Sequence, residues 1–144
     1  MVGPDGLLHM QTLPVTGIVK AHASNNLNTD SAAGATAYSC GLKTYNGAIG
    51  VNPEAVPCKT ILELAEEKGL STGLVSTSSI THATPASFAA HVKKSKMQQV
   101  IAVDFLDSGV EVFLGGGVKW FSKENRTDSL DLMGQFAEAG YKVI

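Results

Sequence analysis

The stretch Thr60–Thr77, TILELAEEKGLSTGLVST, is typical of a helix that leads into a buried strand. Thr60 can cap the helix because Glu63 follows three residues later. The apolar residues after Thr60 recur at helical spacing as far as Gly69. Residues 73–77, GLVST, then form a short apolar run of the kind found in buried strands. The sequence therefore predicts a helix followed closely by a strand.

The same alternation of helices and strands continues on both sides of this stretch. Further helices are predicted for residues 31–40 (with Gly41 as the stop), 85–92, 100–109 and 129–139, and further strands for residues 17–21, 110–114 and 141–144. Residues 43–57 contain Asn-Gly and Asn-Pro pairs, which are typical of turns, so they are predicted to form a long connection. Helices that alternate with short apolar strands indicate an α/β fold with a mostly parallel sheet covered by helices.

The composition is that of one globular unit. The chain has 144 residues, of which 44% are hydrophobic and 17% are charged. The formal net charge of -2 argues against a nucleic-acid partner, because binding to a phosphate backbone requires clustered Lys and Arg. The only basic run is Lys93, Lys94 and Lys96, and such a run usually forms a solvated surface.

The sequence gives no indication of a membrane span or of a leader. No run approaches the ~18 to 20 consecutive apolar residues that cross a bilayer, and residues 1–5 lack the basic start of a signal peptide. Cys40 and Cys58 are interpreted as two thiols, with a mutual disulfide as the alternative. Residues 142–144 resemble the start of a strand, so we expect the sequence to continue in a longer parent protein.

Residues 29–37, TDSAAGATA, carry the strongest chemical signal. A polar loop delivers Ser31 to the first turn of the helix predicted for residues 31–40. Free backbone N–H groups and the positive end of the helix dipole favour an anion there, which suits a phosphoryl group. The alternative is that Asp30 or Ser31 is an ordinary helix N-cap.

Several segments occur in the order and at the spacing of a known family. They are TDSAA at 29–33, CGLKTYNGAIGV at 40–51, KTILELA at 59–65, THATPASF at 81–88 and FLGGG at 113–117. Together they resemble the nucleophile-bearing portion of alkaline phosphatases, and the resemblance covers most of the chain. It implies a three-layer α/β/α fold of the alkaline-phosphatase type, in which residues 1–144 form a single partial domain with only part of the sheet.

The resemblance also implies a reaction, which is hydrolysis of phosphate monoesters through a phosphoserine intermediate with zinc and magnesium. Ser31 matches the nucleophile that zinc coordinates, and Asp30 matches the neighbour that orients a phosphate-binding arginine. Thr84 matches a threonine that helps to hold the third metal, usually magnesium; the alternative for it is a cap ahead of the next helix. His82 matches a position near that metal, although a hydrogen-bonded structural role is an equal alternative, and His91 is interpreted as structural.

The sequence departs from the family pattern at the phosphate-binding arginine. By spacing from His91, this position is Ser95, which Lys94 and Lys96 flank. A lysine supplies charge but lacks the planar fork of arginine, so we expect Lys94 or Lys96 to support the phosphate site with a weaker grip. Because a catalytic zinc takes about three protein ligands, most zinc ligands are expected from beyond residues 1–144.

These departures lead to further expectations. The parent protein is expected to be periplasmic or secreted, as the family usually is, and the isolated chain is expected to be inactive. A non-catalytic truncated segment that folds or self-associates, with a homodimer formed through exposed sheet edges, is one alternative. A related metal-dependent phosphodiesterase or sulfatase is another, although the chain lacks the Pro- and Arg-containing sulfatase motif.

Overall fold

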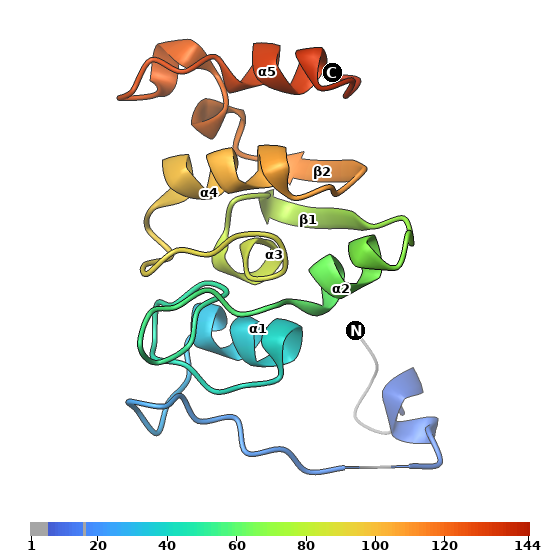
Figure 1. Ribbon diagram of the computed structural model, residues 1–144. Helices are drawn as coiled ribbons and strands as arrows, with labels where there is room; N and C mark the ends of the chain where they lie inside the picture. Colours follow the sequence, from blue (N-terminus) through green and yellow to red (C-terminus); the bar gives the residue numbers. More distant parts are fainter. Residues whose placement is uncertain (1–5, 16) are drawn as a thin grey trace.

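The computed structural model describes residues 6–15 and 17–144 (Figure 1). Residues 1–5, on which the expectation about a leader depends, lie outside the described residues. The α-helices are α1 (Ser31–Cys40), α2 (Ile61–Glu67), α3 (Ala83–Ala86), α4 (Gln98–Asp104) and α5 (Leu132–Glu138). The strands are β1 (Gly73–Ser79) and β2 (Val112–Gly116), and the 3-10 helices are η1 (His9–Thr12), η2 (Phe105–Asp107), η3 (Val118–Trp120) and η4 (Lys123–Asn125).

The two strands form a parallel sheet. Gly73 pairs with Val112 and Val75 with Leu114, and the register shifts before Ser79 pairs with Gly116. A parallel pair needs a crossover connection, which the chain makes through α3 and α4 (Figure 1). The predicted α/β fold with a partial parallel sheet is therefore confirmed.

The core joins the helices to this sheet. Ile101 and Phe105 are fully buried, and the ring of Phe105 stacks on Phe113 of β2 with 4.8 Å between ring centroids. Helix α1 packs against α3, and both present fully buried small residues there, such as Ala32 and Ala86. Alanine side chains let the two helices approach closely, which accounts for the small residues that follow Ser31.

Helix ends that depend on neighbouring residues were predicted correctly. Helix α1 stops at Gly41, whose φ of 70° is a left-handed conformation that suits glycine. The Thr60 hydroxyl accepts from the Glu63 N–H at 3.1 Å, and the Glu63 carboxylate accepts from the Thr60 N–H at 2.7 Å. The helix expected at residues 100–109 is present as α4 followed by η2.

Two predicted strands are wrong. Residues 17–21 form no strand and lie on an exposed arm (Figure 1). The Lys43 ammonium donates to the carbonyls of Lys20 (2.6 Å) and His22 (2.7 Å) there. Residues 141–144 are also irregular, and the N–H of Tyr141 bonds the Phe136 carbonyl at the end of α5. A strand requires a neighbouring strand for its backbone hydrogen bonds, and the described part of the chain supplies none to either segment.

Two predicted helices have the wrong bounds. Helix α3 begins at Ala83 and ends at Ala86, whereas a helix over 85–92 was predicted. The chain leaves the helix because Val92 exchanges both backbone hydrogen bonds with Ile49, at 2.9 and 3.0 Å. The last helix begins at Leu132, not near 129, because the Asp131 carboxylate accepts from the Gly134 N–H and caps it there.

Candidate functional site

Ser31 is the first residue of α1, and its side chain is exposed. The residue before it, Asp30, is the N-cap, and its carboxylate accepts from the Ala33 N–H at 2.8 Å. The capping role therefore belongs to Asp30. The hydroxyl of Ser31 stands at the positive end of a ten-residue helix.

Asn46 holds the loop that enters α1, and sequence reasoning missed this role. Its side-chain oxygen accepts from the Asp30 N–H at 3.0 Å, and its side-chain nitrogen donates to the Asn28 carbonyl at 2.9 Å. Its own N–H donates to the side chain of Asn25 at 3.1 Å. The only sequence signal was the turn-forming Asn-Gly pair, which does not reveal these distant partners.

The same turn contacts the segment that carries the candidate lysines. The N–H of Ser95 donates to the Gly47 carbonyl at 2.7 Å, and the Tyr45 hydroxyl donates to the Lys93 carbonyl at 3.1 Å. Lys94 and Lys96 on either side of Ser95 are exposed. Residues 45–47 therefore connect the backbone of the Ser31 loop with the backbone of the lysine segment.

His82 and Thr84 lie at the start of α3, and both are exposed. His82 is the N-cap residue, but its side chain makes no capping hydrogen bond. His82 borders an open pocket of about 420 Å³ that is also lined by Ser79, Gln98, Gly117, Val118, Lys119 and Trp120. The hydroxyl of the buried Thr81 joins Ser79 to Gln98, with 2.8 Å to each side chain.

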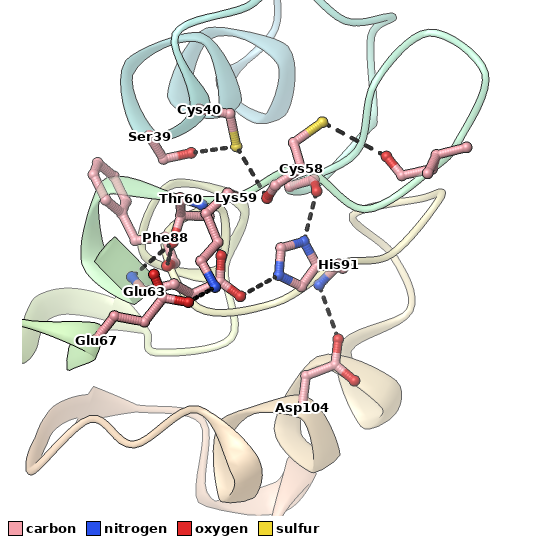
Figure 2. A network of polar contacts seen from close by, with 12 residues as sticks. Ser39, Cys40, Cys58, Lys59, Thr60, Glu63, Glu67, Phe88, His91 and Asp104 are labelled. Atoms are coloured by element: carbon pink, nitrogen blue, oxygen red, sulfur yellow. Dashed lines mark hydrogen bonds and ion pairs between the residues drawn. The ribbon is translucent and has the colours of Figure 1, made fainter. Parts of the chain in front are cut away.

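His91 is fully engaged by neighbouring acceptors (Figure 2). Its Nδ1 lies 2.6 Å from the Gly50 carbonyl and its Nε2 lies 3.0 Å from the Glu63 carboxylate, while its backbone N–H donates to Asp104 at 2.9 Å. These contacts support the structural interpretation of His91. Burial opposes ionisation of Glu63, but hydrogen bonds from Thr60 and the contact with His91 outweigh it and hold the pKa of Glu63 below its usual value.

The described residues do not fit a complete metal centre. Within residues 6–15 and 17–144 there is no group of three or more His, Cys, Asp or Glu side chains that could hold a metal ion. A catalytic zinc takes about three protein ligands, so Ser31, His82 and Thr84 would need further ligands to complete such a site.

In the described residues, no helix is long and apolar enough to cross a membrane.

Comparisons with known proteins give a consistent result. A family model described as "Alkaline phosphatase" matches residues 1–144. Alkaline phosphatase 3 of Bacillus subtilis is 48% identical over 122 residues, which cover 81% of this chain and 26% of the relative. This chain thus spans about a quarter of the length of that relative.

The similar solved structures agree with the sequence comparison. The alkaline phosphatase of the Antarctic bacterium TAB5 superposes with a TM-score of 0.86 at 44% identity, covering 89% of this chain and 37% of that one. A histidine-to-glutamate variant of the TAB5 enzyme, solved with magnesium in its M3 site, gives a TM-score of 0.85 at 43% identity, covering 89% of this chain and 36% of that one.

Proposed function

Because this chain belongs to the alkaline phosphatase family, we propose that the protein that carries it hydrolyses phosphate monoesters. Ser31 is the nucleophile. Its Oγ forms a bond to phosphorus while the bond from phosphorus to the ester oxygen breaks, and the alcohol leaves. Water then hydrolyses the phosphoserine and releases inorganic phosphate. The observation that carries this proposal is the exposed position of Ser31 at the start of α1, where Asp30 takes the cap role.

The N-terminal end of α1 favours the negative charge of the phosphoryl group. Free N–H groups in the first turn donate to anions, and the helix dipole adds to the attraction. The Ala33 N–H holds one oxygen of the Asp30 carboxylate, and Asn46 holds the backbone N–H of Asp30, the residue directly before the nucleophile. This arrangement supports a role for Asp30 in orienting the cationic groups that bind phosphate.

Lys94 and Lys96 supply the positive charge in place of the missing arginine. Both are exposed, and the backbone of Ser95 between them is anchored to the Gly47 carbonyl. An ammonium group attracts phosphate as a point charge but cannot make the two parallel hydrogen bonds of a guanidinium. Phosphate binding is therefore weaker than with an arginine.

Zinc and magnesium are proposed as cofactors because the chain belongs to the alkaline phosphatase family. Magnesium is present in the similar TAB5 variant, and His82 and Thr84 are the residues proposed to approach it here, with Ser31 proposed to approach zinc. Since the described residues lack a cluster of ligands, we assign no step of the reaction to a metal. For the same reason, the 144-residue chain alone is proposed to be inactive.

The partner is a phosphate monoester, and the protein is proposed to act in the periplasm or after secretion. A homodimer is also proposed, because in the described part of the chain β1 and β2 form a two-stranded sheet whose outer edges pair with no further strand. Exposed apolar side chains on this sheet, such as Val75 and Leu114, add to the surface that a partner would cover.

Hydrolysis of a chromogenic phosphate ester, with zinc and magnesium present, tests the proposal. In the natural protein that contains this chain, Ser31→Ala should lower kcat by at least about 1,000-fold, as removal of a nucleophile does in other enzymes. Ser71→Ala is the matched control, since it makes the same chemical change at an exposed position between α2 and β1. A loss of only a few-fold in Ser31→Ala would show that another group attacks the phosphate.

A further inference from the structure

The two cysteines meet at the C-terminal end of α1. Cys40 is the last residue of that helix, and its sulfur lies 3.7 Å from the carbonyl oxygen of Cys58 and 3.4 Å from the Ser39 hydroxyl. Both cysteines are half-buried and free. Figure 2 shows their side chains near the end of α1. This pair is outside the proposed catalytic machinery, which lies at the opposite end of α1.

The backbone on each side of the pair is fixed, while one side chain is turned away. The N–H of Cys58 donates to the Gly50 carbonyl at 2.9 Å, and the N–H of Gly41 after Cys40 donates to Ala37 at 3.0 Å. The Cys58 sulfur now faces the Val56 carbonyl at 3.6 Å (Figure 2). The Cys40 sulfur already lies against the backbone of Cys58, so a bond would require the Cys58 sulfur to take another staggered position about its Cα–Cβ bond.

We propose that Cys40 and Cys58 form a redox-active dithiol, which a low-molecular-weight disulfide such as oxidised glutathione converts to an intramolecular disulfide. The thiolate of Cys58 attacks one glutathione sulfur, and the other glutathione leaves as a thiolate. The thiolate of Cys40 then attacks the Cys58 sulfur and displaces the second glutathione. The protein loses two protons and two electrons, and one oxidised glutathione becomes two reduced glutathiones.

The order of attack follows from exposure. The contact of Cys58 with Val56 is at the surface, whereas the contacts of Cys40 are partly buried. Burial raises the pKa of both thiols. Hydrogen bonds with Ser39 and Cys58 offset part of this rise for Cys40, whereas the neighbouring Cys40 adds to the rise in the pKa of Cys58. Thiolates are therefore scarce near neutral pH, so the disulfide forms slowly there and faster in alkaline solution.

The test is incubation of the reduced 144-residue chain with oxidised glutathione at neutral and at alkaline pH. Intact mass should show loss of two hydrogens without a glutathione adduct, and a non-reducing peptide map should contain one peptide pair joined through Cys40 and Cys58. The midpoint of thermal unfolding should rise by about 5 to 10 °C on oxidation. The bond joins two residues 18 positions apart and so restricts the unfolded chain. The reaction should be faster at alkaline pH.

Single variants separate the two roles. Cys40→Ser should stop at a mixed disulfide with one glutathione on Cys58, and Cys58→Ser should react more slowly at Cys40. Stable adducts on both cysteines, a covalent dimer, or two thiols that remain reduced in the unsubstituted chain would each overturn the proposal. The peptide map of the unsubstituted chain decides the matter even if a variant does not fold.

Discussion

The backbone N–H of Asp30 donates to the side-chain oxygen of Asn46 at 3.0 Å, across 16 residues of sequence. This bond ties the residue before Ser31 to the turn whose Gly47 carbonyl binds the N–H of Ser95. One turn thus fixes the backbone on two sides of the proposed phosphate site.

Replacing Asn46 should loosen the loop that enters α1. In Asn46→Ala, the N–H of Asp30 and the carbonyl of Asn28 lose their partner, so we expect a loss of about 1 to 3 kcal/mol in the free energy of unfolding and faster hydrogen exchange at Asp30. Exchange measured by NMR checks this. Asn52→Ala is the control, because Asn52 accepts from Glu54 and Val56 in a separate turn, and it should leave the Asp30 amide protected.

The carboxylate of Glu63, which accepts from the Thr60 N–H and lies against His91, should make stability depend on pH. Because the pKa of Glu63 is lower in the folded chain than its ordinary value of 4.5, ionised Glu63 stabilises the fold at higher pH. That contribution is complete above pH 4.5 and is lost as the pH falls through the lower, folded-state pKa.

Urea unfolding of Glu63→Gln at several pH values checks this sign. The variant should be less stable than the unsubstituted chain near neutral pH, and the difference should shrink in acid. Glu67→Gln is the control, since Glu67 pairs with Lys59 at an exposed site and such pairs contribute little. A difference for Glu63→Gln that grows in acid would contradict the assignment.

Arg126 should be one of the most sensitive positions for stability. Its side chain is fully buried and donates to the carbonyls of Gln99 (3.0 Å) and Trp120 (2.6 Å) and to the carboxylate of Asp128. Arg126→Ala leaves these acceptors without their donor, so we expect a loss of about 3 kcal/mol or more, measured by urea unfolding. The exposed Lys123→Ala should change stability by less than about 0.5 kcal/mol.

Restoring an arginine should strengthen phosphate binding. In the natural protein that contains this chain, Ser95→Arg should lower the inhibition constant of inorganic phosphate by about tenfold or more, because a guanidinium adds charge-assisted hydrogen bonds. Ser71→Arg adds the same charge at an exposed position between α2 and β1 and serves as the control. An unchanged constant in Ser95→Arg would mean that Lys94 or Lys96 already fills the role.

The isolated chain should bind zinc weakly. With no cluster of three His, Cys, Asp or Glu side chains in residues 6–15 and 17–144, we expect no stoichiometric zinc after dialysis, as measured by elemental analysis, and no phosphatase turnover. Tightly held zinc together with turnover that disappears in Ser31→Ala would show that the chain builds a working site alone.

Local chemistry made part of this structure predictable. The start of α2 was readable because the hydrogen bonds between Thr60 and Glu63 join residues three positions apart. The stop of α1 at Gly41 and the apolar runs of β1 and β2 are equally local, and the parallel pairing follows from their alternation with helices. The loop and the helix after it pointed to Ser31 only as an anion site or a helix cap, and the proposed roles of Ser31 and Asp30 came from the family resemblance.

The remaining features depend on partners far away in the sequence. Residues 17–21 and 141–144 have strand-like composition, but they form no strand because the described residues offer them no neighbouring one. Val92 leaves the helical path because its backbone N–H and carbonyl both bond to Ile49, which lies 43 positions earlier in the sequence. Asn46 became part of the site only when folding brought it against Asp30. Sequence patterns determine where a segment can hydrogen-bond within itself, whereas only the tertiary structure decides which distant groups satisfy the rest.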